Sequence, residues 1–423
     1  MFERRIPEWL RHAPAPSVRG FATLAAFEAI TRGMLISVFP VAMYEALQDA
    51  ALVSSVYFAI GFVSLAMGLL VPFLTRFVPR RFVYATGALS FVAGSLLAGF
   101  GPAETLPVGL ALNSVATVIT FVCFNAYVLD YIQRIELGKC ETLRMFYSAL
   151  GWTVGPVLGV LLWTWWPPAP FLVSATSATI MLAVFAYMRF GNGKLITRAR
   201  RASPNPLAFM GRFFRQPRLI AGWLFAVIRS CGWWAYVVYL PIYAVENGLG
   251  EQLGGIVMSV TNAGLFLSPV MLRWMQRRSV RQSVRTGFAV AGGLFLAAGL
   301  AGHLPWLTVA LLFMGSYFLI LLDICGGLPF LMAVKPSERT EMSAIYSSFR
   351  DVSGIFTPGV AWLILLAAPI SGIFAAAGGA CLLAWGIAGQ LHPRLGQKRL
   401  QPVPDPAASG AGAIPGPATG ARA

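Results

Sequence analysis

Apolar residues fill this chain of 423 amino acids in stretches of roughly 20, separated by short polar turns. A helix of about 20 residues crosses the ~30 Å hydrocarbon core of a bilayer. Within lipid the backbone has to satisfy its own hydrogen bonds, because no water is present to do so. The pattern therefore predicts twelve membrane-spanning helices, at residues 21–44, 52–75, 82–101, 106–129, 145–166, 169–189, 219–244, 253–274, 284–303, 305–329, 342–366 and 369–391.

The composition agrees with an all-α membrane protein. Hydrophobic residues make up 57% of the chain and charged residues 11%, whereas soluble proteins contain about 25% charged residues. The formal net charge is +16. Because an excess of positive charge is also typical of nucleic-acid-binding proteins, the positions of the charges have to decide between the two classes.

The charges separate onto the two sides of the membrane. If successive turns lie on alternate sides, the turns after the odd-numbered helices contain no Lys or Arg. Their acidic residues are Glu45, Asp49, Glu104, Glu246 and Glu251. The other side collects the basic residues, including Arg4, Arg5, Arg11, Arg19, Arg76, Arg80, Arg81, Arg134 and Lys139. By the positive-inside rule both termini are cytoplasmic, as in a bacterial inner-membrane protein, and no nucleic-acid partner is needed to explain the charge.

Two segments do not span the membrane. Residues 190–218 are basic, and the string PLAFMGRFFRQ within them has the amphipathic pattern of a short interfacial helix. Residues 392–423, rich in Pro, Ala and Gly, predict a disordered tail. We therefore expect an N-terminal six-helix bundle at 1–189 and a C-terminal six-helix bundle at 219–391, joined by the basic loop.

The two bundles resemble each other. VPFLTRFVPRR (71–81) and SPVMLRWMQRR (268–278) share a Pro, an Arg and a final Arg-Arg at the same places. Arg32 and Arg229 are separated by the same interval as these two strings, and FYSALGWTVG (146–155) aligns with IYSSFRDVSG (345–354). Two pseudo-symmetric bundles of this kind are a transporter architecture, with the substrate site near the membrane midplane between them.

At this point the sequence resembles the major facilitator superfamily. Arg76, Arg80 and Arg81 match the basic loop that this family carries between helices 2 and 3, although Val71, Thr75 and Val78 replace its glycines and aspartate. GWTVGPVLG resembles the helix 5 motif of drug and metabolite antiporters, through Gly151, Gly155, Pro156 and Gly159. The resemblance implies alternating access, with the motif serving helix packing, gating or both.

Charged residues at the ends of the helices suggest two latches on the cytoplasmic side. We predict that Asp130 pairs with Arg76 or Arg80, and Asp323 with Arg273 or Arg277, since an aspartate in a membrane needs a partner. The arginines of these two regions are Arg76, Arg80, Arg81, Arg273, Arg277 and Arg278. The alternative is that these arginines only fix the topology.

Charges near the midplane are the candidate substrate and coupling site. Arg32 lies about 18 Å along the first helix, and Glu28 precedes it by one turn, so the two can pair. Arg229 has no such neighbour, because Phe225 and Trp233 occupy its flanking turns. The further candidates are Arg350, Asp351, Trp233, Tyr236, Asn125, Asn262 and Tyr317. Burying such groups is unfavourable, which makes the charged ones functional candidates; the polar ones could equally make ordinary contacts between helices.

These observations predict a secondary transporter for a small molecule, not an enzyme. No nucleotide-binding motif is present, and the scattered cysteines and histidines indicate no metal or cofactor. Proton-coupled export through Glu28 is the first hypothesis, with Glu28–Arg32 as a purely structural pair the alternative. Exchange of organic or phosphate anions held by Arg32 and Arg229 is the second, and a transport-inactive receptor or scaffold the third. We expect a monomer in the lipid bilayer that binds its solute and either protons or a counter-solute.

Overall fold

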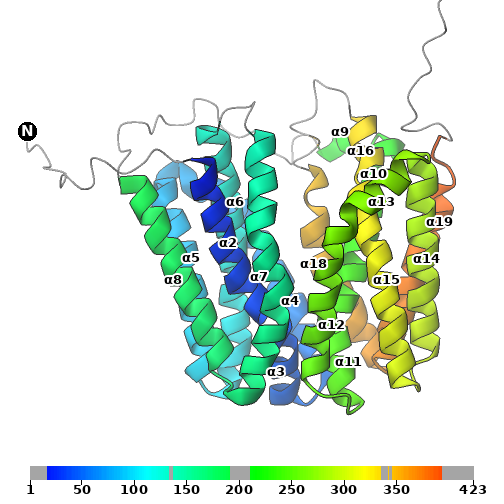
Figure 1. The fold of residues 1–423 in the computed structure, drawn as a ribbon, viewed down its shortest axis with the longest axis horizontal. Helices are drawn as coiled ribbons and strands as arrows, with labels where there is room; N and C mark the ends of the chain where they lie inside the picture. The colour runs from blue at the N-terminus through cyan, green and yellow to red at the C-terminus, as the bar shows by residue number, and fades with distance from the viewer. Residues whose placement is uncertain (1–16, 133–136, 191–209, 335–341, 343–344, 393–423) are drawn as a thin grey trace, which may run out of the picture.

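The structure is a computed structural model that describes residues 17–132, 137–190, 210–334, 342 and 345–392 (Figure 1). All the regular elements among these residues are helices, which confirms the all-α fold class. The tail and most of the basic central loop, residues 191–209, lie outside the described residues. Within the described residues, the predicted interfacial helix is represented by a single turn, α9 (Met210–Phe213).

The described part of the first half contains seven α-helices. They are α2 (Val18–Leu35), α3 (Val38–Leu47), α4 (Ala50–Phe77), α5 (Arg80–Phe100), α6 (Leu106–Tyr131), α7 (Leu137–Trp165) and α8 (Ala169–Phe190). A 3-10 turn, Ala103–Thr105, joins α5 to α6.

Among the described residues, the second half begins with α9. Its further helices are α10 (Pro217–Trp234), α11 (Leu240–Glu246), α12 (Gln252–Ala263), α13 (Ser268–Gln276), α14 (Val280–Leu300), α15 (Pro305–Cys325), α16 (Leu328–Ala333), α18 (Phe349–Leu365) and α19 (Ser371–Ala388). A π-helical segment, Ala235–Tyr239, joins α10 to α11, and a 3-10 segment, Gly264–Leu267, joins α12 to α13.

Ten helices among the described residues are long and apolar enough to span a membrane. The other two predicted spans, 253–274 and 342–366, are present but are not continuous α-helices. The first is broken at Gly264–Leu267, just before Pro269, which has no N–H to continue the helix. In the second, the long helix α18 begins only at Phe349, after a turn at Ser347 and Ser348.

The first and seventh predicted helices are also interrupted, at matching places. The first bends between Leu35 and Val38, and the seventh passes through the π-helical segment before Leu240. In each case a proline follows, Pro40 in α3 and Pro241 in α11. Because proline cannot donate the backbone hydrogen bond, both helices change direction there.

The two halves stand side by side, and each has a basic and an acidic end (Figure 1). The end at which α2 begins and α19 ends is called the basic end. The opposite end is called the acidic end, and it carries Glu45, Asp49, Glu104, Glu246 and Glu251. The ribbons of the two halves meet toward the acidic end and diverge toward the basic end (Figure 1).

Helix α4 packs on α18, and α7 packs on α12, to join the halves. At Gly61 a Cβ atom would lie 2.8 Å from the carbonyl oxygen of Gly354, so these backbones touch. The hydroxyl of Tyr239 donates a 3.0 Å hydrogen bond to Ser54 across the same interface. This close packing closes the molecule toward its acidic end.

Candidate functional site

The predicted charge pair in the first half is formed. Arg32 Nη1 lies 3.2 Å from Glu28 Oε1, one helical turn away on α2. The Arg32 side chain is 36% exposed and that of Glu28 is 16% exposed. The guanidinium also lies over the ring of Trp152 on α7, 5.2 Å from its centroid. Arg32 is therefore held by a carboxylate and an aromatic face, while part of it stays accessible.

The second half contains a charge pair that contradicts one of the predictions. Arg229 Nε lies 2.9 Å from Asp323 Oδ1, so Asp323 pairs with Arg229 and not with Arg273 or Arg277. Trp233 Nε1 donates a 3.0 Å hydrogen bond to the other carboxylate oxygen. The pair joins α10 to α15, which are distant in sequence and adjacent in the fold. A search for partners one turn away on the same helix could not find it.

Arg350, at the start of α18, reaches across to the first half. Its guanidinium lies 5.0 Å from the ring centroid of Phe121 on α6 and 5.7 Å from that of Phe349. Arg350 is exposed, and among the described residues no carboxylate forms an ion pair with it. Its side chain is thus fixed by aromatic rings that leave its charge uncompensated.

Four arginines from both halves influence one another electrostatically at this place. Arg350 is within electrostatic reach of Arg32, Arg144 and Arg229, and Asp351 is its nearest acidic influence. Among the described residues, Glu28 and Asp323 each form an ion pair with one arginine of this group, Arg32 and Arg229 respectively. Arginines from both halves that lie near one another make this place favourable for an anionic ligand.

Arg144 is the member of this cluster that the sequence did not reveal. The predicted fifth helix starts at residue 145, whereas α7 begins at Leu137, so Arg144 lies about two turns inside it. Its Nη1 donates a 3.2 Å hydrogen bond to the predicted candidate Asn125 on α6. The spacing Arg144, Ser148, Trp152 marks one helical face and was the signal available in the sequence.

Other predicted residues lie in the core of the second half. Tyr236 is 1% exposed, and its hydroxyl shares a 2.6 Å hydrogen bond with Thr261, which in turn bonds Ser316 at 3.1 Å. The ring of Tyr317 packs on Gly264, at the end of α12. These contacts are internal to one half, so the geometry favours a packing role for both tyrosines.

The helix 5 motif packs α7 against α2. A Cβ atom on Gly151 would lie 2.8 Å from the backbone of Ala29 and Ile30, and one on Gly155 would lie 2.7 Å from Gly33. Gly159 approaches the carbonyl of Met34 even more closely. No side chain fits at these positions, and the glycines let the two backbones touch, as predicted for packing.

Pro156 in the same motif creates a contact with the other half. Because proline has no N–H, the carbonyl of Trp152 one turn earlier has no helical donor. Asn262 on α12 donates to that carbonyl through Nδ2, at 2.6 Å. The next backbone N–H, that of Val157, donates to Ser259 Oγ on α12 at 3.0 Å. The kink thus provides the backbone groups by which α7 and α12 are joined.

The predicted latches are only partly within the described structure. The side chains of Arg76 and Asp130 lie outside it. Arg80 lies over Tyr127 at 5.3 Å, Arg81 lies over Phe82 at 4.8 Å, and Arg273 and Arg277 are exposed. The latch in the first half stays a prediction; the one in the second half is wrong as to its partners, because Asp323 is bound to Arg229.

Within the described part of the chain, no group of three or more His, Cys, Asp or Glu side chains could hold a metal ion. The side chains of Cys123, Cys140, Cys231, Cys325 and Cys381 are buried, and no disulfide joins any two of them. The groups that converge on the space between the halves are arginines, carboxylates and aromatic rings.

A helical membrane protein with two bundles and a charged site between them has the architecture of a secondary transporter. The sequence model of the Major Facilitator Superfamily matches residues 21–358. The chain therefore belongs to this superfamily, as its resemblance indicated, and is a transporter and not an enzyme. No curated relative matches it in sequence.

Solved transporter structures share the fold. The nucleoside transporter NupG superimposes with a TM-score of 0.65 and 13% identity, over 89% of this chain and 99% of that one. A peptide transporter solved with sulfate gives 0.69 and 17%, over 88% and 94%. A D-xylose-proton symporter gives 0.66 and 13%, over 87% and 96%. At such low identities the likeness concerns the fold alone.

Proposed function

We propose that this transporter carries a small organic anion by alternating access, with the anionic group held among the arginines between the halves. The observation that supports the proposal is Arg350, whose guanidinium is exposed, lies on aromatic rings and has no ion-pair partner among the described residues. Arg32 and Arg229 are already paired with acids. They set the positive surroundings, and Arg350 provides the direct contact to a carboxylate or phosphate.

The conformation of the structure corresponds to one end state of an alternating-access mechanism, which supports the proposal. The halves touch toward the acidic end through Asn262, Ser259 and Tyr239. If the basic end is cytoplasmic, as the positive-inside rule predicts, this is the inward-facing state. With no nucleotide site in the sequence, the driving force comes from a solute or ion gradient.

The test is transport and binding of a library of organic anions by the full chain in proteoliposomes. Arg350→Gln should weaken binding of the transported anion about 10- to 100-fold, because a hydrogen bond to a charged group contributes roughly 1.5–3 kcal/mol. Arg350→Lys should restore only part of the affinity, since it keeps the charge and loses the planar fork. Arg19→Gln, which removes one exposed charge far from this cluster, is the control. Preferential transport of neutral or cationic solutes would contradict the proposal.

Proton coupling is the second candidate, and a contact between the halves supports it. Glu45 on α3 and Glu251 before α12 belong to different halves and are close enough to influence each other electrostatically. Two neighbouring carboxylates repel each other, and a proton on one of them relieves the repulsion. Closure of the acidic end would then take up a proton, and opening would release it.

Two substitutions separate the routes by which protons could couple. Glu28→Gln should abolish pH-driven accumulation and leave counterflow of substrate intact if Glu28 is the coupling residue, whereas a structural pair would lose both. Glu45→Gln should remove the pH dependence of closure at the acidic end, because an amide donates to Glu251 at any pH. If both variants keep full pH-driven transport, neither residue couples protons, and anion exchange without protons remains.

A further inference from the structure

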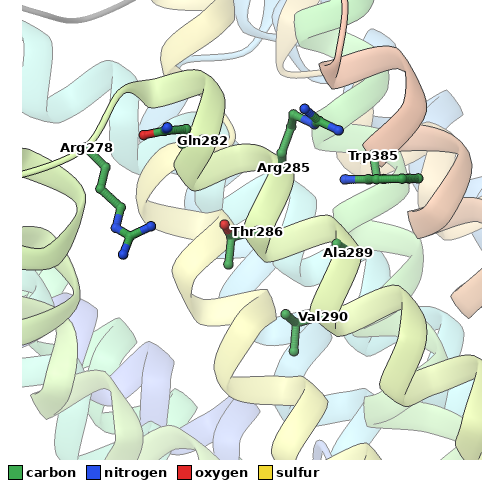
Figure 2. Close-up of a pocket in the computed structure, with 7 residues that line it drawn as sticks. All are labelled: Arg278, Gln282, Arg285, Thr286, Ala289, Val290 and Trp385. Carbon is green, nitrogen blue, oxygen red and sulfur yellow. The ribbon is translucent and has the colours of Figure 1, made fainter.

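A pocket lies on the outer face of the second half, away from the space between the halves. It has a volume of about 330 Å³ and is formed by the turn before α14, the first turns of α14, and one residue of α19. Its lining residues, shown in Figure 2, are Arg278, Gln282, Arg285, Thr286, Ala289, Val290 and Trp385. The described cluster of arginines and carboxylates contributes nothing to it.

The polar end of the pocket is strongly basic. Arg278 and Arg285 both reach it, and α13, α14 and α19 contain no acidic residue at all. Ring faces hold both guanidinium groups: Arg278 lies 4.8 Å from the centroid of Trp274, and Arg285 lies 5.2 Å from that of Trp385. The Nε atom of Arg285 is buried without a hydrogen-bond partner. The two charges are thus fixed in place and not neutralised, which suits an anionic group.

The other end of the pocket is apolar and lies deeper in the membrane. Thr286 and Val290 are about 9 and 15 Å from the start of α14, by the helical rise. Ala289 and Val290 form this part, Gln282 and Arg285 lie toward the opposite end, and the side chain of Arg278 extends along one side as far as Thr286 (Figure 2). Gly293 continues the same face of α14, and a Cβ atom there would meet nothing within 4 Å. The groove therefore runs from the level of the headgroups toward the hydrocarbon.

One further arginine in this region is held by a hydrogen bond to the backbone of the neighbouring helix. Arg281, between the two arginines in sequence, donates through Nη2 to the carbonyl of Gly389. It caps the end of α19 and ties it to α14, which leaves Arg278 and Arg285 as the groups that face the pocket. A soluble anion would use the basic end alone, whereas the full length of the groove requires a ligand with an anionic head and an apolar chain.

We propose that this groove binds a phospholipid, its anionic headgroup along the start of α14 with Arg278 on one side and Arg285 on the other, and one acyl chain along Ala289 and Val290. At the basic end the lipid joins α13, α14 and α19, and so braces the second half where it moves against the membrane. The positive-inside rule places the groove in the leaflet that is rich in anionic lipids.

Native mass spectrometry of the delipidated full chain, titrated with phosphatidylglycerol and with phosphatidylcholine, tests the proposal. Phosphatidylglycerol should bind more tightly, and Arg278→Gln with Arg285→Gln should weaken it roughly 25-fold, about fivefold for each arginine removed near the surface. Ala289→Trp, which fills the apolar part and keeps both charges, should also remove the bound lipid. The matched control is Arg19→Gln with Arg215→Gln, which removes two exposed charges elsewhere and should bind as the wild type does.

Three results would overturn the proposal. Equal losses in the arginine pair and in the matched control would mean that only the overall charge matters. Unchanged binding in Ala289→Trp would mean that no chain occupies the groove. Binding of glycerol phosphate as tight as that of phosphatidylglycerol would make it a site for soluble anions. Thermal unfolding of each variant in phosphatidylcholine identifies any that is misfolded. If the double arginine variant is, Arg278→Gln alone and Arg285→Gln alone take its place, and each should weaken binding about fivefold.

Discussion

Asn262 and the carbonyl of Trp152 make the contact between the halves whose loss has the most definite consequence. Pro156 leaves that carbonyl without its helical donor, and Asn262 Nδ2 supplies one at 2.6 Å. Asn262→Ala removes the donor and leaves a carbonyl in the interface unbonded. The lost bond contributes about 1 kcal/mol, and an unsatisfied buried carbonyl costs about 1–3 kcal/mol. We therefore expect the ratio of molecules closed at the acidic end to molecules open there to fall at least about fivefold.

Spin labels at the acidic end measure this population directly. Glu104→Cys in the first half and His303→Cys in the second place one exposed label on each side. The native cysteines are buried, so they compete little for the label. The distance distribution from double electron–electron resonance should shift toward longer distances in Asn262→Ala. Asn113→Ala is the control, because Asn113 is buried to the same degree and bonds only within its own helix, to Gly109.

A second substitution tests the reason for the effect. In Pro156→Ala the new backbone N–H can donate to Trp152 within α7, so the carbonyl no longer depends on Asn262. Asn262→Ala should then shift the distances much less in the Pro156→Ala background than in the wild type. Equal shifts in both backgrounds, or a shift in Asn113→Ala as large as in Asn262→Ala, would refute the reasoning.

Two further predictions concern stability, measured as thermal unfolding in detergent. Asp323→Asn should destabilise the protein by several kcal/mol, because it leaves the partly buried Arg229 without its carboxylate, and adding Arg229→Gln should recover part of the loss; an additive double variant would show that the pair is not coupled. Gly33→Ala should lower the melting temperature, since its Cβ would strike the carbonyl of Gly151, whereas Gly293→Ala, which meets open space, should not; similar losses in both would contradict the packing argument.

Local patterns in the sequence predicted what depends on neighbours along one helix. The length of the apolar runs gave the helices, and the interval of four residues gave the contact between Glu28 and Arg32. The glycines of the helix 5 motif indicated a close approach, and they meet the backbone of α2 from Ala29 to Met34. Each of these features follows from the periodicity of a helix, so no knowledge of the tertiary fold was required.

What was missed depends on distant partners or on the exact start of a helix. Local spacing gives partners for Arg229 only one turn away on the same helix, whereas Asp323 lies on another helix. Arg144 was excluded because the predicted helix began at residue 145, whereas α7 begins at Leu137, in a stretch of polar residues. Pro156 implied that the carbonyl of Trp152 lacks its helical donor, but only the packing of α12 on α7 shows that Asn262 donates to it.

Trp152 connects the charged site with the contact between the halves. Its ring packs against the guanidinium of Arg32, and its carbonyl accepts the hydrogen bond from Asn262. Because α2 and α7 pack backbone to backbone, a movement of the first half that breaks the bond to α12 also moves Trp152 and Arg32 together, relative to Arg350 in the second half. A ligand can favour one state only through contacts that differ between the states. An anion bound between Arg32 and Arg350, as proposed, would have such contacts, and by linkage the closure of the acidic end would in turn change its affinity.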